Sequence, residues 1–497
     1  MYTFSSKLKT FSFILIVLGL LGIGYGFLTA PKNIEEVEKI LAANEHGGHH
    51  SGAEKHVANH ETHHEVTQPK VEKHESKLTE KGQPETAGKA KDTTITDTTE
   101  VMEVPAPVMS DKEIAKSKED AEKVAHEEHQ EHLEHVLHQL QNKPWAALYV
   151  ACIFFLLITM GVLAFYAIQQ VAQSGWSPVL FRVMQGITAY LPVGSVIFFV
   201  LLLLAGFHFN HLFPWLDPEV VAHDKIIQNK AGYLNFPFWI VRALVFLLGW
   251  NLYRYFSRKN CLAQDESNDN SFYKKNFNIS AMFLVFFIVT ESIMSWDWIM
   301  SLDPHWFSTL FGWYVFASFF VSGITTICMV TIYMKSKGYL EHVNSSHIHD
   351  LAKFMFGISV FWTYLWFSQF MLIWYANIPE EVTYFVTRIE DYNLPFFGAI
   401  VMNFVFPILI LINTDFKRIT WVLVMAGVVI LIGHYIDFFN MIMPATVGDQ
   451  WFIGAAELGS VSFFLGLFML VVFTAMTKAP LLPKRNPYIE ESKHFHY

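Results

Sequence analysis

Ten long apolar stretches recur along the chain, separated by shorter polar segments. Each is close to the roughly 20 residues that an α-helix needs to cross a hydrocarbon core of about 30 Å. Most carry almost no charge and lack the polar face of a helix on the surface of a soluble protein. The pattern predicts an all-α integral membrane protein with ten transmembrane helices, at residues 10–29, 146–169, 187–207, 235–256, 279–300, 308–333, 352–376, 395–413, 419–440 and 453–476.

The distribution of Lys and Arg predicts how these helices are oriented. Placing the amino terminus in the cytoplasm gives 17 basic residues to the cytoplasmic segments, against three in the short loops on the other side, Lys225, Lys230 and Arg388. Cytoplasmic loops typically carry such an excess, so we expect both termini in the cytoplasm. A cleaved signal peptide is the alternative for the first stretch, which follows Lys7 and Lys9, but its length favours a retained helix.

A polar insert at residues 30–144 carries the whole net charge of the chain. It holds 14 Lys and Arg against 24 Asp and Glu, whereas the rest of the chain is neutral. Residues 43–108 have too few apolar side chains to form a core, so we expect disorder there, followed by a charged helix near 110–142. A neutral apolar body with an acidic insert does not suit nucleic-acid binding.

Histidines recur every third residue in the expected charged helix, at His126, His129, His132, His135 and His138. Imidazole is a common metal ligand, so metal capture is one interpretation. A three-residue period drifts around an α-helix and never gathers four ligands on one face. We therefore favour a solvated helix that docks on a partner.

Few ionisable side chains occur inside the predicted membrane helices, where a charge at the bilayer centre costs about 2.5–3.5 kcal/mol. Such residues are functional candidates, and here they are Arg242, Glu291, Asp297, His434, Asp437 and Glu457. His434 and Asp437 are three residues apart and share a helix face, so this pair could accept protons from a quinol or relay them outward. The alternative is a structural role, with Arg242 neutralising a carboxylate to hold helices together.

The chain lacks the residues that redox centres need. Its three cysteines, Cys152, Cys261 and Cys328, are too few and too scattered for an iron–sulfur cluster, and no Cys-x-x-Cys-His sequence occurs. A pair of membrane haems would need buried histidines on facing helices, and His434 is the one histidine well inside a predicted span. We therefore expect that the chain conducts no electrons and that it holds no metal.

Two motifs resemble a known family. Residues 295–312 read Ser-Trp-Asp-Trp-Ile-Met-Ser-Leu-Asp-Pro-His-Trp-Phe-Ser-Thr-Leu-Phe-Gly, and residues 230–235 read Lys-Ala-Gly-Tyr-Leu-Asn ahead of Arg242. Together with ten spans and the insert, they resemble the ActF membrane subunits of the bacterial alternative complex III, which are similar to the NrfD and polysulfide-reductase membrane anchors. Residues 310–314 read Leu-Phe-Gly-Trp-Tyr where a related subunit has its quinol-site motif.

The resemblance implies two four-helix bundles, formed by spans 2–5 and 6–9, with the first and tenth spans outside them. The corresponding regions are 1–29 for the first helix, 30–144 for the insert, 145–300 and 301–440 for the bundles, and 441–497 for the last helix and tail. It also implies a bacterial plasma membrane location and a complex with partner subunits that bear c-type haems and iron–sulfur clusters, together with a homologous membrane subunit. A menaquinone-type quinone is the one ligand it suggests.

We therefore expect a membrane subunit of a quinol-oxidising respiratory complex that handles protons and has no redox centre of its own. The expected proton-handling residues are Arg242, Glu291, His434 and Asp437, with Asp297, Asp303 and His305 at the outer exit and Glu457 as a further candidate. A non-catalytic scaffold subunit of the same complex is the first alternative, and a stand-alone secondary transporter is the second.

Overall fold

The computed structural model describes residues 2–46 and 111–496, with side chains for 2–42 and 123–496. The chain divides into two compact units, one formed by Met1–His49 and Leu133–Tyr497 and the other by His50–His132. Over these described residues the regular structure is helical, with no strand. The disorder that we expect for residues 43–108 concerns a segment almost entirely outside the described residues.

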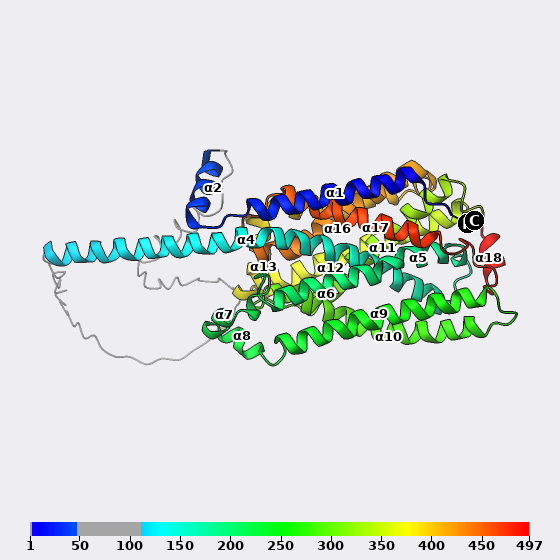
Figure 1. The fold of residues 1–497 in the computed structure, drawn as a ribbon, viewed down its shortest axis with the longest axis horizontal. Coiled ribbons are helices and arrows are strands. Elements are labelled where there is room, and N and C mark those ends of the chain that lie inside the picture. Colours follow the sequence, from blue (N-terminus) through cyan, green and yellow to red (C-terminus); the bar gives the residue numbers. More distant parts are fainter. Residues whose placement is uncertain (1, 47–110, 497) are drawn as a thin grey trace, which may run out of the picture. The chain divides into compact units, whose positions relative to one another are not determined.

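Ten helical segments of the described chain are long and apolar enough to cross a membrane, which confirms the predicted all-α membrane architecture (Figure 1). Several extend beyond the predicted apolar stretches, because a helix can continue past the hydrocarbon layer. The segments are α1 (Ser6–Thr29), α4 (Asp111–Val171), Pro178–Gly206 with α5 (Phe181–Ile187) and α6 (Leu191–Gly206), α9 (Phe236–Gln264), α10 (Ser271–Trp298), α11 (Phe311–Ser336), α12 (Ser345–Ala376), α14 (Asn393–Ile400) continued by α15 (Phe406–Leu411), α16 (Thr420–Val447) and α17 (Ala455–Met476).

The charged helix that we expect near 110–142 is not a separate element. It runs without a break into the second span as α4, which contains Pro144 and ends at Val171. All five of its regularly spaced histidines, His126, His129, His132, His135 and His138, are exposed. Metal capture and partner docking both remain predictions for this segment.

The first bundle is formed by α4, the α5–α6 segment, α9 and α10. Near one end of this bundle, the Tyr166 hydroxyl of α4 lies between the helices. It accepts hydrogen bonds from Gln185 of α5 (3.0 Å), Ser257 of α9 (3.2 Å) and Asn276 of α10 (3.2 Å). One polar group therefore joins all four segments, as expected for helices that cannot gain stability from burying apolar surface against equally apolar lipid.

The second bundle is formed by α11, α12, α14–α15 and α16. Asn440 of α16 donates a hydrogen bond to the Pro395 carbonyl of α14 (3.0 Å), and the other helices meet at Asp437, as described below. Between α14 and α15 lies a π-helical turn, η5 (Val401–Val405). Such turns are rare in globular proteins and often occur at functional sites.

The two bundles meet where α4 crosses α11. A side chain at Gly323 would lie 2.8 Å from the Val162 backbone nitrogen, and one at Gly161 would lie 2.5 Å from the Phe319 carbonyl oxygen. Glycine at both positions allows the two backbones to touch. The apolar, membrane-spanning part of each helix is almost entirely buried, so their crossing forms the centre of the helical body.

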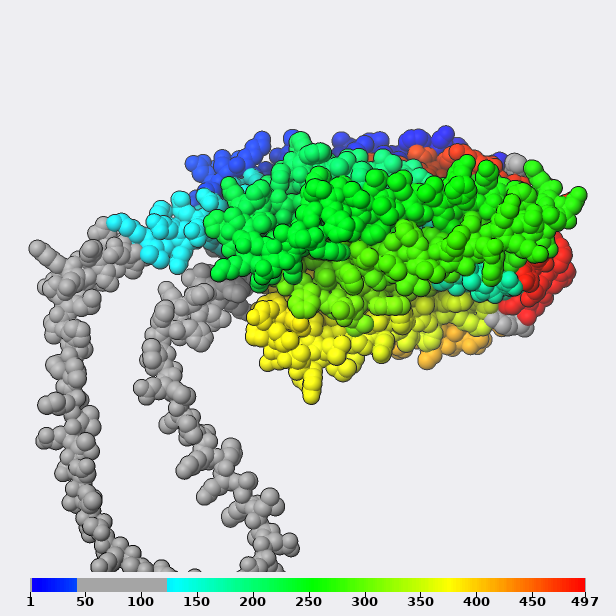
Figure 2. Space-filling view, turned by 90° about the horizontal axis from the view of Figure 1, so that it is seen from below, coloured from blue at the N-terminus to red at the C-terminus, as the bar shows by residue number. Residues whose placement is uncertain are grey.

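The first and last membrane helices, α1 and α17, pack against each other. Gly22 and Gly459 face each other at backbone distance, and Gly19 and Gly26 lie against Phe463 and Ala456. α17 also packs against α5, at the side of the first bundle. In Figure 2 the visible face is largely the green segment that includes α9 and α10, with the yellow segment of the second bundle along one edge.

Short helices lie outside the spans, and their ends carry several side chains of the site. They are α2 (Ile34–His46), α7 (Pro218–His223), α8 (Lys225–Lys230), α13 (Pro379–Glu390) and α18 (Ile489–Lys493). Both termini lie at one end of the helical body, because the Thr3 hydroxyl contacts that of Tyr339 (2.7 Å) and Asn344 bonds the Phe495 carbonyl (2.5 Å). This agrees with an even number of spans.

Candidate functional site

The ionisable residues that we predicted within the spans are all buried. Their relative exposures range from 0 to 9%, so none points outward from the helical body. The structure brings His434 together with Asp437 and Arg242 together with Asp297, but leaves Glu291 and Glu457 each without a second member of the set. The six residues therefore form separate groups and no single network.

Asp437 of α16 lies at the centre of the second bundle, where two other helices supply three hydrogen-bond donors. From α11, the Tyr314 hydroxyl bonds one carboxylate oxygen and the Ser318 hydroxyl bonds the other at 2.8 Å. From α12, the Trp362 indole nitrogen donates to the second oxygen at 2.9 Å. Tyr314 and Ser318 are four residues apart, which places them one turn apart on the same face of α11.

His434 belongs to this cluster through Ser318. Its Nδ1 lies 2.9 Å from the Ser318 hydroxyl and 3.8 Å from the Asp437 carboxylate. Ser318 has one hydroxyl proton and donates it to Asp437, so the neutral imidazole must carry its own proton on Nδ1. The result is a continuous chain of exchangeable hydrogens from His434 through Ser318 and Asp437 to Tyr314.

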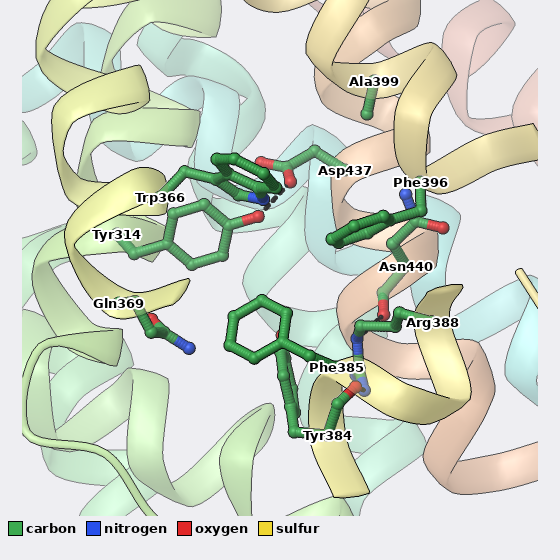
Figure 3. Close-up of a pocket in the computed structure, with 10 residues that line it drawn as sticks. All are labelled: Tyr314, Trp366, Gln369, Tyr384, Phe385, Arg388, Phe396, Ala399, Asp437 and Asn440. Carbon is green, nitrogen blue, oxygen red and sulfur yellow. Dashed lines mark hydrogen bonds between the residues drawn. The ribbon is translucent and has the colours of Figure 1, made fainter. Parts of the chain in front are cut away.

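A small cavity of about 10 Å³ adjoins Asp437 (Figure 3). This space is about enough for one water molecule, which needs two to four polar partners. Gln369 and Asn440 line the cavity, and within the described chain the side-chain oxygen of each is buried without a hydrogen-bond partner. A quinone headgroup does not fit here, since ligand pockets typically measure roughly 300–1,000 Å³.

Arg388 also lines this cavity, and the sequence analysis missed it. It is buried on α13, where its guanidinium donates to the carbonyls of Asn440 (3.0 Å) and Tyr384 (2.7 Å) and lies 3.3 Å from the centre of the Tyr384 ring. No carboxylate of the described residues lies within ion-pair distance. Arg388 lies in the segment between two spans, where we counted it, but α13 folds back against α16 and buries its side chain.

Arg242 and Asp297 form a closed ion pair in the first bundle. The arginine Nε and Nη2 lie 2.6 and 2.9 Å from the two carboxylate oxygens, and the guanidinium stacks on Tyr233 with 4.0 Å to the ring centre. Trp239 donates to the Asp297 carbonyl at 2.9 Å. Such bidentate pairs are strong and geometrically specific, which suits the structural role that we gave as the alternative.

Glu291 and Glu457 have local partners. Glu291 accepts a hydrogen bond from Ser292 (3.2 Å) and lies 3.5 Å from the Ser295 hydroxyl, both on its own helix. Glu457 accepts from the backbone N–H of Gly454 (2.8 Å) and so caps the start of α17. A carboxylate in the first turn of a helix is stabilised by the free N–H groups there. This capping role explains why Glu457 is buried, and no role in proton transfer is needed to explain it.

Asp303 and His305 lie in the connection between α10 and α11. His305 contacts the Asp224 carboxylate through Nε2, and its backbone N–H donates to Asp303 at 3.3 Å. Both side chains are partly exposed. Among the residues with described side chains, no group of three or more His, Cys, Asp or Glu lies close enough to hold a metal ion.

No protein-family model matches the chain, and no curated protein is significantly similar to it. The family resemblance of residues 230–235 and 295–312 therefore remains a hypothesis.

Proposed function

We propose that this chain is a proton-handling subunit of a quinol-oxidising respiratory complex in the bacterial plasma membrane, with Asp437 as the group that takes up and releases the proton. The observation that carries the proposal is the surroundings of Asp437. It is a buried carboxylate held by hydroxyl and indole donors, it lacks a cation in direct contact among the described residues, and it borders a space for one water.

Such surroundings permit both charge states of the carboxyl. When Asp437 is ionised, Tyr314, Ser318 and Trp362 each donate a hydrogen bond to it. When it is protonated, its own O–H can donate to the Tyr314 oxygen or to a water in the cavity, because hydroxyl groups both donate and accept. A proton can therefore pass along the cluster by reorientation of hydroxyls, without a large rearrangement.

Arg388 gives the cavity a fixed positive charge. An incoming proton is repelled from a space lined by a guanidinium, since charges interact strongly where water is scarce. A protonated water is therefore disfavoured in the cavity, and the proton is held on Asp437 instead. Tyr384, which stacks on Arg388, is itself stacked on Trp306 with ring centres 4.0 Å apart, so aromatic side chains hold the guanidinium in place.

The electrons would be carried by partner subunits with c-type haems and iron–sulfur clusters, alongside a homologous membrane subunit. A menaquinone-type quinol would supply both electrons and protons. The contribution of this chain is to accept protons at Asp437 and pass them on, which matches a subunit without redox centres of its own.

The test is Asp437→Asn in the assembled complex, with proton release and quinol oxidation measured separately. We expect the rate of proton release to fall at least tenfold, since one proton-transfer group typically contributes about 10²–10⁴ in rate. Asp437→Glu should restore part of the release. Glu390→Gln removes an exposed carboxylate from the helix that bears Arg388 and should change nothing. Unchanged proton release in Asp437→Asn would contradict the proposal.

A scaffold role is the second candidate, and the closed Arg242–Asp297 pair favours it. It predicts that removing the subunit dissolves the complex while Asp437→Asn has no effect on turnover or proton release. A stand-alone transporter would purify without haem absorbance, which separates it from both other proposals.

A further inference from the structure

A second, larger cavity lies at the end of the first bundle, away from Asp437. It measures about 410 Å³ and is formed by the segment between α8 and α9 and by the connection from α10 to α11. Its volume falls within the range of roughly 300–1,000 Å³ that is typical of ligand sites. We call it the rim cavity.

The walls of the rim cavity are mainly aromatic. Tyr233, Trp296, Trp306 and Phe307 line it, and Phe307 is more than half exposed, so the cavity is open on one side. The floor is rigid, because Tyr233 stacks on the Arg242 guanidinium that is fixed by Asp297. Several aromatic faces around one space form a favourable environment for an organic cation.

The charged side chains of the rim cavity are one cation and one anion, Lys230 and Asp303. Lys230 donates to the Pro304 carbonyl at 2.5 Å, and its ammonium lies 5.7 Å from the centre of the Phe307 ring. Burial lowers the pKa of Lys230, whereas Asp303 and Asp224 act in the opposite direction. A ligand with one positive and one negative group matches this lining, whereas a singly charged ligand leaves one wall charge without a partner.

The position of the rim cavity relative to the spans indicates where its ligand comes from. The candidate spans begin or end at Phe236, Leu302 and Phe311, and the cavity lies among these three ends. This is the depth at which lipid headgroups and interfacial tryptophans meet. Beside Tyr233, α9 presents an exposed apolar stripe of Phe238, Val241, Val245 and Leu248, along which acyl chains can run.

We propose that the rim cavity binds the headgroup of a zwitterionic phospholipid. The ammonium group lies among the aromatic rings and against the Asp303 carboxylate, and the phosphate accepts hydrogen bonds from Lys230. The acyl chains follow the exposed stripe of α9. Asp303 is then a lipid ligand and not the proton exit that we expected from the sequence, and this assignment does not depend on the function of Asp437.

The experiment is native mass spectrometry of the purified full-length protein, in its complex where it has one, titrated with four probes. Phosphatidylethanolamine and phosphatidylcholine share the proposed chemistry and differ in the size of the ammonium. Phosphatidylglycerol lacks an ammonium, and menaquinone lacks both charges. We expect one molecule of phosphatidylethanolamine or phosphatidylcholine to be retained about tenfold more tightly than phosphatidylglycerol, since the ammonium adds both an ion pair and aromatic contacts.

Two variants locate the site. Asp303→Asn should reduce this preference for a zwitterionic headgroup to about twofold or less, because the carboxylate that pairs with the ammonium is gone. Phe307→Leu, at an exposed position that should not disturb folding, should weaken phosphatidylethanolamine and phosphatidylcholine but not phosphatidylglycerol. Glu219→Gln removes an acidic side chain of α7 that does not line the cavity, and serves as the control.

Equal retention of phosphatidylglycerol, or displacement of the lipid by menaquinone, would overturn the proposal. So would variants at Asp303 and Phe307 that both behave like the Glu219 control. These outcomes are independent of proton release in Asp437→Asn, so a failure of the lipid site is distinguishable from a failure of the proposed function.

Discussion

In the first bundle Arg242 and Asp297 face each other through two short contacts, whereas in the second bundle Asp437 and Arg388 line one cavity and are each held by uncharged groups. In the first arrangement each charge neutralises the other, so a change in the protonation of either group would break the ion pair. The second leaves a carboxyl that can exist in either state. Under the proposed function, the buried charges of the first bundle hold helices together, whereas the buried carboxyl of the second bundle transfers protons.

The largest expected effect concerns the Arg242–Asp297 pair, which we expect to stabilise the first bundle. Removing one partner of a buried pair leaves the other charge uncompensated, which typically costs about 3–5 kcal/mol. We expect Arg242→Met to lower the free energy of unfolding in detergent by that amount. The double variant Arg242→Met with Asp297→Leu should recover most of the loss, because apolar side chains can replace a buried ion pair. Equal losses in the single and double variants would show that the pairing is not what stabilises this region.

Arg388 provides the matching test in the second bundle. Arg388→Met removes a cation whose hydrogen-bond partners are backbone carbonyls. The substitution therefore does not leave a buried carboxylate without its counter-ion. We expect a smaller loss of about 1–3 kcal/mol in the free energy of unfolding, the cost of leaving buried acceptors unsatisfied. A loss as large as that of Arg242→Met would mean that Arg388 and Asp437 act as an ion pair across the cavity.

The smallest expected effect is a local pH dependence at the exposed end of the first bundle. Hydrogen bonds from the backbone N–H of Ile227 and Ile226 and from His305 keep the pKa of Asp224 below its usual value. A lowered pKa in the folded state stabilises that state above the ordinary value near 4, and the contribution is lost as the pH falls through the lowered pKa. The protection of the α8 amides against hydrogen exchange, corrected for the intrinsic exchange rate at each pH, should therefore fall below about pH 4.

Asp224→Ala should produce faster exchange in α8 at neutral pH, with the amides of α16 around Asp437 unchanged. Accelerated exchange in both regions would show that the two bundles unfold together, and the contrast between them would then lose its basis.

The membrane helices could be predicted from the sequence because hydropathy is a local property of each stretch. The pairing of His434 with Asp437 was also predictable, since it follows from their spacing on one helix. Their partners Tyr314, Ser318 and Trp362 were not, because these residues come from other helices more than 70 positions away in the chain. The sequence contains no signal for which polar residues on different helices will meet.

The burial of Arg388 could not be predicted from the sequence either. Arg388 lies in a short segment between two apolar stretches, so the sequence alone indicates a charged residue in a loop. Its burial depends on α13 packing against α16, a tertiary contact. The nearby Tyr384 and Phe385, on the same side of a twelve-residue helix, were the one local signal that this segment has a buried face.

The glycine contacts between α1 and α17 have a consequence for how the protein is made. Membrane helices enter the bilayer in the order of synthesis, so α1 must wait for more than 400 further residues before the surface that fits it is produced. During translation α1 is therefore either held by insertion machinery or free to diffuse near the ribosome. A nascent chain released before α17 emerges would lack the complementary helix and present an unfilled glycine face to quality-control proteases.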